Sequence, residues 1–143
     1  MKTARRLVTV LAAAVTLVVP SVALAESAQA ATAHLCNTDL VKTVTGKGNV
    51  GLPYYKASSG STLDCYMQLG STGAGVKELQ YDLIFCYDQD IDPDGSFGPA
   101  TQTALRSAQR AAKIAIDGSY GPETRTHILW DFAGASTVHC QTL

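Results

Sequence analysis

The sequence predicts an all-α fold, a three-helix bundle with two Asp-Gly turn-helix repeats, preceded by a disulfide-bonded N-terminal extension of loops and short strands. Three observations support this prediction. Apolar residues recur at steps of three and four from Gly73 onward, as they do on one face of a helix. An eight-residue block at 94–101 recurs 23 residues later, at 117–124. Glycine, serine and β-prone residues fill the segment 34–72, which has little helical periodicity.

The first 25 residues have the three parts of a secretory signal peptide. A basic start precedes an apolar run of 13 residues, Leu7 to Val19, and the small residues Ala23-Leu24-Ala25 provide a cleavage site. Cleavage after residue 30 is an alternative, because Ala28-Gln29-Ala30 has the same pattern. The run is shorter than the about 20 apolar residues of a transmembrane helix. We therefore expect a secreted protein, extracellular or associated with a cell wall, with no membrane attachment after cleavage. An uncleaved membrane anchor is the alternative.

Residues 31–72 form the predicted extension, a looped segment with one or two short strands. β-prone residues between Thr43 and Tyr55 are separated by glycines and a proline, and Ser58-Ser59-Gly60-Ser61 follows them. A segment of about 40 residues is too small to build its own core. We therefore expect it to be closed by a disulfide and to dock on its neighbour.

Residues 73–133 form the predicted bundle. The first helix is expected to run from Gly73 to about Tyr87, and the second from Pro99 to about Lys113. The third helix begins at Pro122, since proline suits the first helical position. Its inward residues are predicted to be Ile128, Leu129 and Phe132. The bundle is expected to run up, down and up, with short links.

The four cysteines, Cys36, Cys65, Cys86 and Cys140, suggest two disulfides in an exported protein. Three pairings are possible. In an up-down-up bundle, the first and third helices end on the same side, which favours Cys86 with Cys140. Cys36 and Cys65 then close the extension, and residues 134–143 become a disulfide-tethered C-terminal tail.

Charge argues against a nucleic-acid partner. The chain has 143 residues, with 11 Lys+Arg against 12 Asp+Glu and a formal net charge of −1. No stretch has more than two adjacent basic residues. Nucleic-acid binding depends on clustered cations that neutralise phosphates, so we expect no nucleic-acid partner.

The internal repeat is the most specific motif in the chain. Asp-Gly-Ser-Phe-Gly-Pro-Ala-Thr at 94–101 and Asp-Gly-Ser-Tyr-Gly-Pro-Glu-Thr at 117–124 are identical at six of eight positions. In each copy, Asp-Gly predicts a tight turn and Gly-Pro the start of a helix.

With these blocks, residues 73–132 resemble the peptidoglycan-binding-like domains, the small three-helix modules attached to many bacterial cell-wall hydrolases. The family pattern Val-x-x-Leu-Gln is matched by Val76, Leu79 and Gln80, and Gln109 matches a second glutamine. Ala108 stands where the family usually has an aromatic residue. Part of the core is therefore expected to be filled by Tyr81, Trp130 or the extension. The resemblance implies a module that binds peptidoglycan or a related cell-wall polymer.

Candidate ligand-binding residues lie around the two Asp-Gly turns and on the helices that follow them. They are Asp94, Ser96, Phe97, Arg106, Tyr120 and Arg125. The rings of Phe97 and Tyr120 could stack on sugars, with packing in the core as the commoner alternative. The arginines could pair with peptide carboxylates, or be solvated helix residues. Trp130 and the other tyrosines could form a second carbohydrate surface or pack in the interior.

We expect neither catalysis nor a cofactor. The three histidines are scattered, no G-x-S-x-G motif occurs, and the cysteines are expected to be paired. The pattern Asp90-x-Asp92-x-Asp94-Gly95 fits the first half of a calcium loop, but Thr101 occupies its twelfth position. We interpret this segment as a solvated acidic turn, with calcium as the alternative, and expect no metal.

The leading hypothesis is therefore a secreted, non-catalytic module that binds a bacterial cell-wall polymer. The alternative is a secreted protein-interaction or inhibitor protein on the same scaffold. In that case an exposed loop from Gly51 to Ser61, braced by a disulfide, would contact a protein partner.

Overall fold

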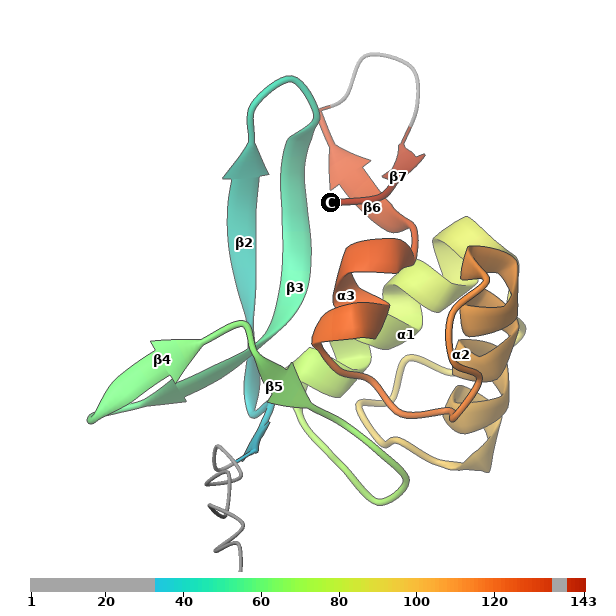
Figure 1. Cartoon of the computed structure of the whole chain (residues 1–143), viewed down its shortest axis with the longest axis horizontal. Helices are drawn as coiled ribbons and strands as arrows, with labels where there is room; N and C mark the ends of the chain where they lie inside the picture. Colours follow the sequence, from blue (N-terminus) through green and yellow to red (C-terminus); the bar gives the residue numbers. More distant parts are fainter. Residues whose placement is uncertain (1–32, 135–138) are drawn as a thin grey trace, which may run out of the picture.

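The protein has a mixed α/β fold in a computed structural model that describes residues 33–134 and 139–143. The expected signal peptide lies outside these described residues. Three helices pack beside a five-stranded sheet and a two-stranded sheet. In Figure 1 a long β-hairpin stands on one side of the molecule, α2 on the other, and α1 and α3 between them. The predicted all-α class is therefore wrong, although the three predicted helices are present.

The extension is where the fold class departs from the prediction. Its longest strands are β2 (Thr38–Val44) and β3 (Gly48–Ala57), which pair antiparallel. The tip of this hairpin uses Gly46, with a φ of 79°, a left-handed conformation that costs glycine little. β3 continues past β2 and pairs with β4 (Gly60–Thr62).

Two further short strands complete the extension, β1 (His34–Leu35) and β5 (Cys65–Tyr66), which pair in parallel. The expectation of loops with one or two strands underestimated this segment. Val50 and Leu52 alternate with more exposed residues along β3 and are fully buried in the core. These two residues form an apolar face of β3, and α1 packs against this strand. The glycines and the proline of β3 do not suggest such a strand from composition alone.

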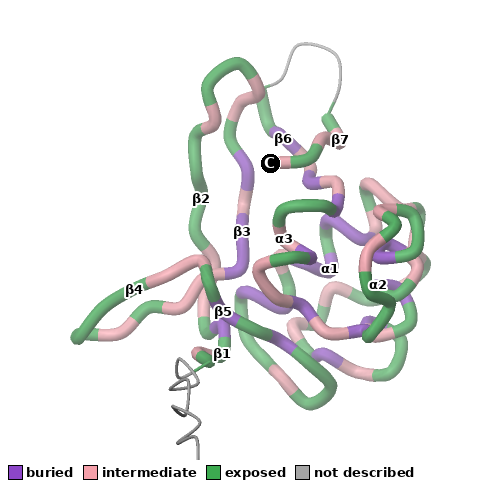
Figure 2. Tube along the Cα trace, in the orientation of Figure 1, coloured by how far each residue is buried: buried purple, intermediate pink, exposed green. Residues whose placement is uncertain are grey.

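The first two helices lie close to their predicted positions. α1 spans Ala74–Tyr87 and α2 spans Pro99–Ala112. Each ends at a residue in the left-handed conformation, Asp88 (φ 52°) and Lys113 (φ 58°). Figure 2 shows their buried residues facing the interior and exposed residues on the outer side of α2.

The third helix is much shorter than predicted. α3 spans only Pro122–His127, and β6 (Trp130–Ala133) follows it. The chain turns at Ile128, whose ψ of 163° is extended rather than helical. Ile128, Trp130 and Phe132 are buried at steps of two, the period of a strand. β6 then pairs with β3 and with β7 (Cys140–Gln141).

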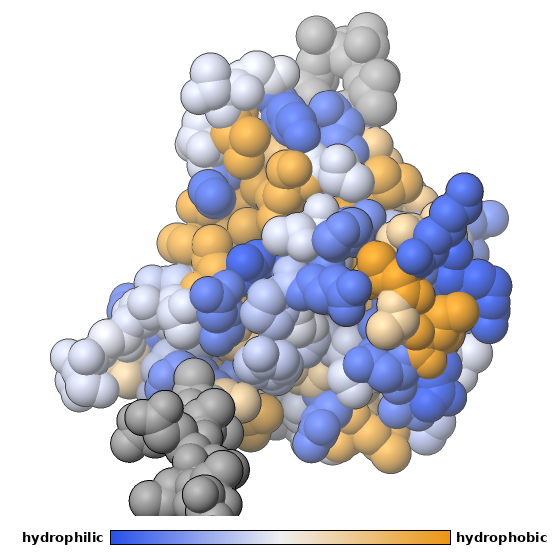
Figure 3. Space-filling view, viewed as in Figure 1, coloured by the Kyte–Doolittle hydropathy of each residue, from blue (hydrophilic) through white to orange (hydrophobic). Residues whose placement is uncertain are grey.

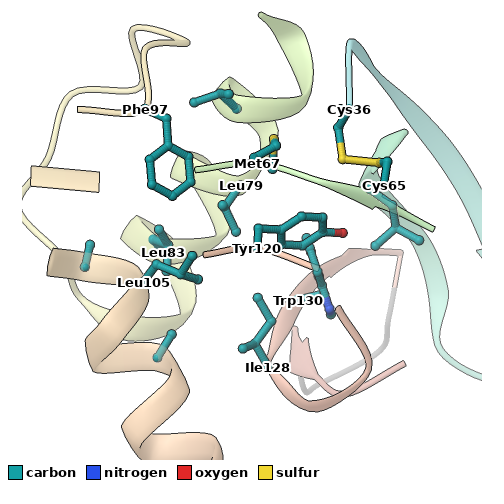
Figure 4. Packing of buried hydrophobic residues seen from close by; sticks show 14 of the residues in the cluster. Cys36, Cys65, Met67, Leu79, Leu83, Phe97, Leu105, Tyr120, Ile128 and Trp130 are labelled. Carbon is teal, nitrogen blue, oxygen red and sulfur yellow. A yellow bond between two sulfur atoms is a disulfide. The ribbon is translucent and has the colours of Figure 1, made fainter. Parts of the chain in front are cut away.

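Extension and helices share one hydrophobic core. Met67 from the extension packs with Leu79 of α1, Leu105 of α2 and the buried rings of Tyr120 and Trp130 (Figure 4). The Tyr120 and Trp130 rings meet edge to face, with centroids 6.1 Å apart. Trp130 thus helps to fill the core that also contains Ala108, whereas Tyr81 remains 38% exposed.

One disulfide closes the extension on itself, and the other connects the C-terminal end to α1. Cys36 is bonded to Cys65, and Cys86 to Cys140, which is the pairing that the sequence favoured. The route to the second bond differs from the expected one. Cys140 reaches the end of α1 on strand β7 rather than at the end of a third long helix.

The outer surface is mixed in character. On the face drawn in Figure 3, apolar patches lie over the β2–β3 hairpin and over the α2 side, separated by hydrophilic residues. In the described part of the chain, no helix has the length and apolar character needed to cross a membrane.

Candidate functional site

Each Asp-Gly repeat folds into a turn that is closed by a buried glutamine. In the first turn, the Gln80 Oε1 accepts a hydrogen bond from the Gly95 N–H at 2.8 Å. The Gln80 Nε2 lies 3.0 Å from the Asp94 Oδ1, 3.1 Å from the Ser96 carbonyl and 2.9 Å from the Thr101 Oγ1. One side chain therefore connects the turn to α1 and α2.

The second turn repeats this arrangement around Gln109. The Gln109 Oε1 accepts from the Gly118 N–H at 2.9 Å. Its Nε2 donates toward the Asp117 Oδ1 (2.8 Å), the Ser119 carbonyl (3.0 Å) and the Thr124 Oγ1 (3.2 Å). The sequence repeat is thus also a repeat of hydrogen bonds.

The glutamines are the structural residues whose role the sequence analysis missed. Both are 1% exposed, although they lie beside apolar positions on their helices. A buried polar side chain needs internal partners, and a glutamine on an apolar stripe is the signal that could have revealed this role. Hydrogen bonds from Gln80 and from the Ser96 N–H also hold the pKa of Asp94 below its usual value.

The two aromatic candidates are buried. Phe97 is 1% exposed and Tyr120 is fully buried, so neither presents a ring face to a sugar. Their backbones pair with the segment that leads into α1. Tyr120 exchanges two hydrogen bonds with Met67, and the Phe97 N–H donates to the Ser71 carbonyl. The alternative of packing in the core is the one that the structure shows, and the same holds for Trp130.

The other candidates are divided between structural and exposed positions. The Arg125 guanidinium contacts the Leu63 carbonyl and lies 3.0 Å from the Asp64 carboxylate, so it attaches α3 to the extension. Arg106 is exposed, and its Nη2 lies 3.4 Å from the Asp117 carbonyl. Asp94 and Ser96 are exposed, but Asp94 belongs to the first turn and its hydrogen bonds. The six residues therefore do not form one surface.

A pocket of about 280 Å³ lies against the second turn. Its walls include Asp117 and Ser119 from the turn, Glu123 from α3 and Tyr66 from β5. Tyr66 is 42% exposed. An exposed tyrosine has an apolar face and a polar tip, and here it stands beside carboxylates and a hydroxyl. These groups suit a ligand that has both apolar faces and hydroxyl or amide groups.

Gly121 fixes the position of the Tyr66 ring. A Cβ atom at Gly121 would lie 2.9 Å from the Tyr66 Cε1, so the ring lies directly over this glycine. The corresponding glycine of the first turn, Gly98, has no atom within 4 Å of its Cβ position. The two turns therefore share one framework, but within the described residues an aromatic ring covers this glycine only in the second.

The segment expected to bind a protein partner is not an exposed loop. Gly51 to Ala57 belong to β3, where Leu52 and Pro53 are buried. Its exposed residues are Lys56 on β3 and the four residues Ser58 to Ser61 at the β3–β4 turn. Because β3 is paired with β2 and β4, most of its backbone is already hydrogen-bonded and does not form the free loop expected to contact a protein partner.

In the part of the chain that the structure describes, no three or more His, Cys, Asp or Glu side chains are grouped as metal ligands. The Asp94 carboxylate is hydrogen-bonded to Gln80 and to the Ser96 N–H. At the end of the acidic segment, the Asp94 carboxylate is thus held by the side-chain amide of Gln80.

In comparisons with known proteins, a family model matches the helical part of the chain. Residues 72–128 match a family model described as "Putative peptidoglycan binding domain". No curated protein is significantly similar in sequence to this chain.

Two solved structures are similar to parts of the chain. One is a fused Zn-dependent amidase/peptidase/peptidoglycan-binding domain-containing protein from Clostridium acetobutylicum ATCC 824, with 41% identity and a TM-score of 0.41. That similarity covers 43% of this chain and 27% of the other. The second is a peptidoglycan-binding protein from Clostridioides difficile in complex with glutamine hydroxamate, with 24% identity and a TM-score of 0.44. It covers 60% of this chain and 53% of the other.

The family model spans both Asp-Gly turns, both glutamines and helices α1 to α3. The extension, β6 and β7 lie outside it. The resemblance found in the sequence is confirmed for this segment, because residues 72–128 match the model of a peptidoglycan-binding domain.

Proposed function

We propose that this protein is a secreted, non-catalytic module that binds peptidoglycan. The observation that carries the proposal is the family match over residues 72–128, which includes both glutamine-closed turns. Peptidoglycan combines sugar rings with short peptides, so a binding surface needs apolar faces and hydrogen-bonding groups together. The pocket at the second turn offers both.

Within this proposal, Tyr66 is the main contact and not the buried Tyr120. Its ring is held over Gly121, next to the Asp117 and Glu123 carboxylates. A ring already held in place loses little conformational freedom on binding, which favours affinity. The carboxylates and the Ser119 hydroxyl can accept hydrogen bonds from sugar hydroxyls or peptide amides.

Secretion is part of the same proposal. Two disulfides fit an oxidising compartment outside the cytoplasm. We place a signal peptide at residues 1–25, or at 1–30 with the later cleavage site. The domain division at residues 72 and 73 separates the proposed binding module from an extension that contributes Tyr66.

Co-sedimentation with purified peptidoglycan sacculi tests this function. The oxidised protein should pellet saturably, and Tyr66→Ala should weaken binding by about 5- to 30-fold, which corresponds to about 1–2 kcal/mol for an aromatic contact residue. Tyr66→Phe keeps the ring and should retain most of the affinity. Leu40→Ala truncates an apolar side chain that is 37% exposed on β2 and serves as the matched control. Equal binding by wild type and Tyr66→Ala would refute the assigned site, and no pelleting of wild type at tens of micromolar would refute the function.

A further inference from the structure

A second pocket, of about 350 Å³, lies between the β2–β3 hairpin, α1 and β6. Three carboxylates line it, from Glu78 and Asp82 on α1 and from Asp131 on β6. The rings of Tyr81 and Phe85 form another wall. Its lining shares no residue with the pocket at the second turn, so it is a separate site. Its volume is at the lower end of the range of small-molecule pockets, about 300–1,000 Å³.

Asp82 is the buried group of this pocket. It is 3% exposed, and its Oδ1 accepts a hydrogen bond from the Asp131 N–H at 2.8 Å. Its Oδ2 is buried and has no hydrogen-bond partner. Burial raises the pKa of Asp82 well above its usual value. A buried acceptor without a partner is costly, and a donor supplied by a ligand would remove that cost.

Glu78 lies one helical turn before Asp82, over a strand position that has no side chain. A Cβ atom at Gly51 would lie 1.7 Å from the Glu78 Oε1. The glycine therefore leaves the space that the carboxylate occupies. Burial raises the pKa of Glu78, and the negative charges of Asp39 and Asp131 raise it further.

The negative charge of this pocket is largely uncompensated. Among the described residues, no lysine or arginine forms an ion pair with Glu78, Asp82 or Asp131. The basic neighbour is His139, whose Nδ1 lies 3.6 Å from the Asp131 Oδ1. Clustered carboxylates that repel one another favour a positively charged ligand.

The aromatic wall suits the same kind of ligand. The Tyr81 and Phe85 rings stack with centroids 6.2 Å apart, and Phe85 is 65% exposed. The Lys77 Nζ already lies 5.9 Å from the Tyr81 ring centroid, so this ring attracts an ammonium group within the protein itself. A side chain with an apolar stem could lie along Phe85 and direct its charge to the carboxylates.

We propose that this pocket binds a primary ammonium group carried on an aliphatic chain. The ammonium group donates hydrogen bonds to Glu78 and to the unpartnered oxygen of Asp82, and the aliphatic chain packs against Phe85. We assign the ammonium group to a diamino-acid side chain in the peptide part of peptidoglycan, and this assignment rests on the proposed function. The chemical class of the ligand rests on the pocket alone.

Binding is expected to strengthen as the pH rises, because an ionised carboxylate attracts the ammonium group more strongly than a carboxylic acid does. The groups that face the pocket or its rim come from every element packed there, and are Asp39, Lys77, Glu78, Asp82, Asp131 and His139. The Lys77 Nζ, 5.9 Å from the Tyr81 ring centroid, competes with a ligand for that ring.

The first test is an NMR titration of the oxidised protein at pH 7 with Nα-acetyl-lysine N-methylamide. The matched probe is Nα-acetyl-norleucine N-methylamide, which has the aliphatic chain without the amine. The lysine probe should bind saturably and shift the amide signals of Gly51, Phe85 and Asp131. Glu78→Gln should weaken binding about tenfold, as expected for the loss of a charge-assisted hydrogen bond. Gly51→Ala, which displaces Glu78, should also weaken it, whereas Asp92→Asn at an exposed remote site should not.

Equal binding of the two probes, shifts confined to other regions, or an unchanged affinity in Glu78→Gln would overturn the ammonium site. Unchanged signals elsewhere in the spectrum of Glu78→Gln show that the variant is folded, so a loss of binding then supports the site.

The second test assigns the source of the ammonium group. Sacculi treated with acetic anhydride carry amides in place of free amines. Acetylation should weaken wild-type binding and leave Glu78→Gln unaffected, whereas Tyr66→Ala should weaken binding to both preparations. Equal wild-type binding to both would overturn the assignment to wall peptides and favour a lysine of a protein partner. Failure to bind either preparation would instead overturn the proposed function, while the probe titration would still stand.

Discussion

Replacing Gln109 by methionine is the sharpest test of how the second turn is built. Methionine has a similar length and no hydrogen-bonding amide, so Gln109→Met removes the four contacts to Gly118, Asp117, Ser119 and Thr124. The side chain is 1% exposed, so water cannot easily replace those contacts.

The magnitude follows from the groups left behind. The Gly118 N–H is buried and would lose its acceptor, which costs about 1–3 kcal/mol. The lost bonds from the amide to its acceptors add about 1 kcal/mol. We expect the free energy of unfolding to fall by about 2–4 kcal/mol. In urea this corresponds to a decrease of about 1–2 M in the unfolding midpoint for a protein of this size.

Two variants provide matched controls in the same equilibrium unfolding experiment. Gln80→Met removes the equivalent set of contacts from the first turn and should destabilise by a similar amount. Gln102→Met changes a half-buried glutamine on α2 whose side chain makes no hydrogen bond within the described residues, and should stay within about 0.5 kcal/mol of wild type. Under conditions where all variants are folded, Gln109→Met should weaken sacculus binding and Gln80→Met should not. If Gln109→Met were as stable as Gln102→Met, the glutamine would not close the turn and the reasoning would be refuted.

Two further predictions concern the pocket carboxylate and the second disulfide. Because burial raises the pKa of Asp82, its ionisation opposes folding as the pH rises above the usual value of 3.8, so Asp82→Asn should raise the free energy of unfolding at pH 7. That gain should vanish below about pH 4 in urea titrations, and a gain independent of pH would contradict the assigned cause. The double variant Cys86→Ser with Cys140→Ser opens a loop with a sequence separation of 54 and should lower stability by up to about 4 kcal/mol. A loss below about 1 kcal/mol in the same unfolding assay would show that β7 is held by other contacts.

The helical part of the fold was predictable because its signals are local. Proline at the first position of α2 and α3, and glycine at position 95 and 118 with φ near 74° and 73°, fix the turns through backbone preference alone. The predicted disulfide pairing is also confirmed, although the third long helix on which that prediction depended is absent from the described residues.

The strands were not predictable in the same way, because their stability depends on distant partners. The segment 128–133 was predicted as helix from Ile128, Leu129 and Phe132, but Trp130–Ala133 form β6, which pairs with β3. β3 contains two glycines and a proline, which disfavour strands, yet it pairs with β2, β4 and β6.

The candidate site shows the same limit. The repeat identified the turns, but not which aromatic residue is exposed. Tyr120 has the right position in the motif and is buried by Met67 and Trp130, which come from segments on either side of the repeats. Tyr66 lies over Gly121 only because the disulfide-bonded extension folds back on the second turn. Single-sequence patterns do not reveal that contact.

The most direct test of the central claim is a binding isotherm on sacculi for wild type, Gly121→Ala and Gly98→Ala. The two variants add the same methyl group at equivalent glycines, but only the one at Gly121 would displace the Tyr66 ring. We expect saturable wild-type binding, similar binding by Gly98→Ala and weakening of about fivefold or more by Gly121→Ala, equivalent to about 1 kcal/mol. Equal affinities for all three proteins would contradict a peptidoglycan site at the second turn.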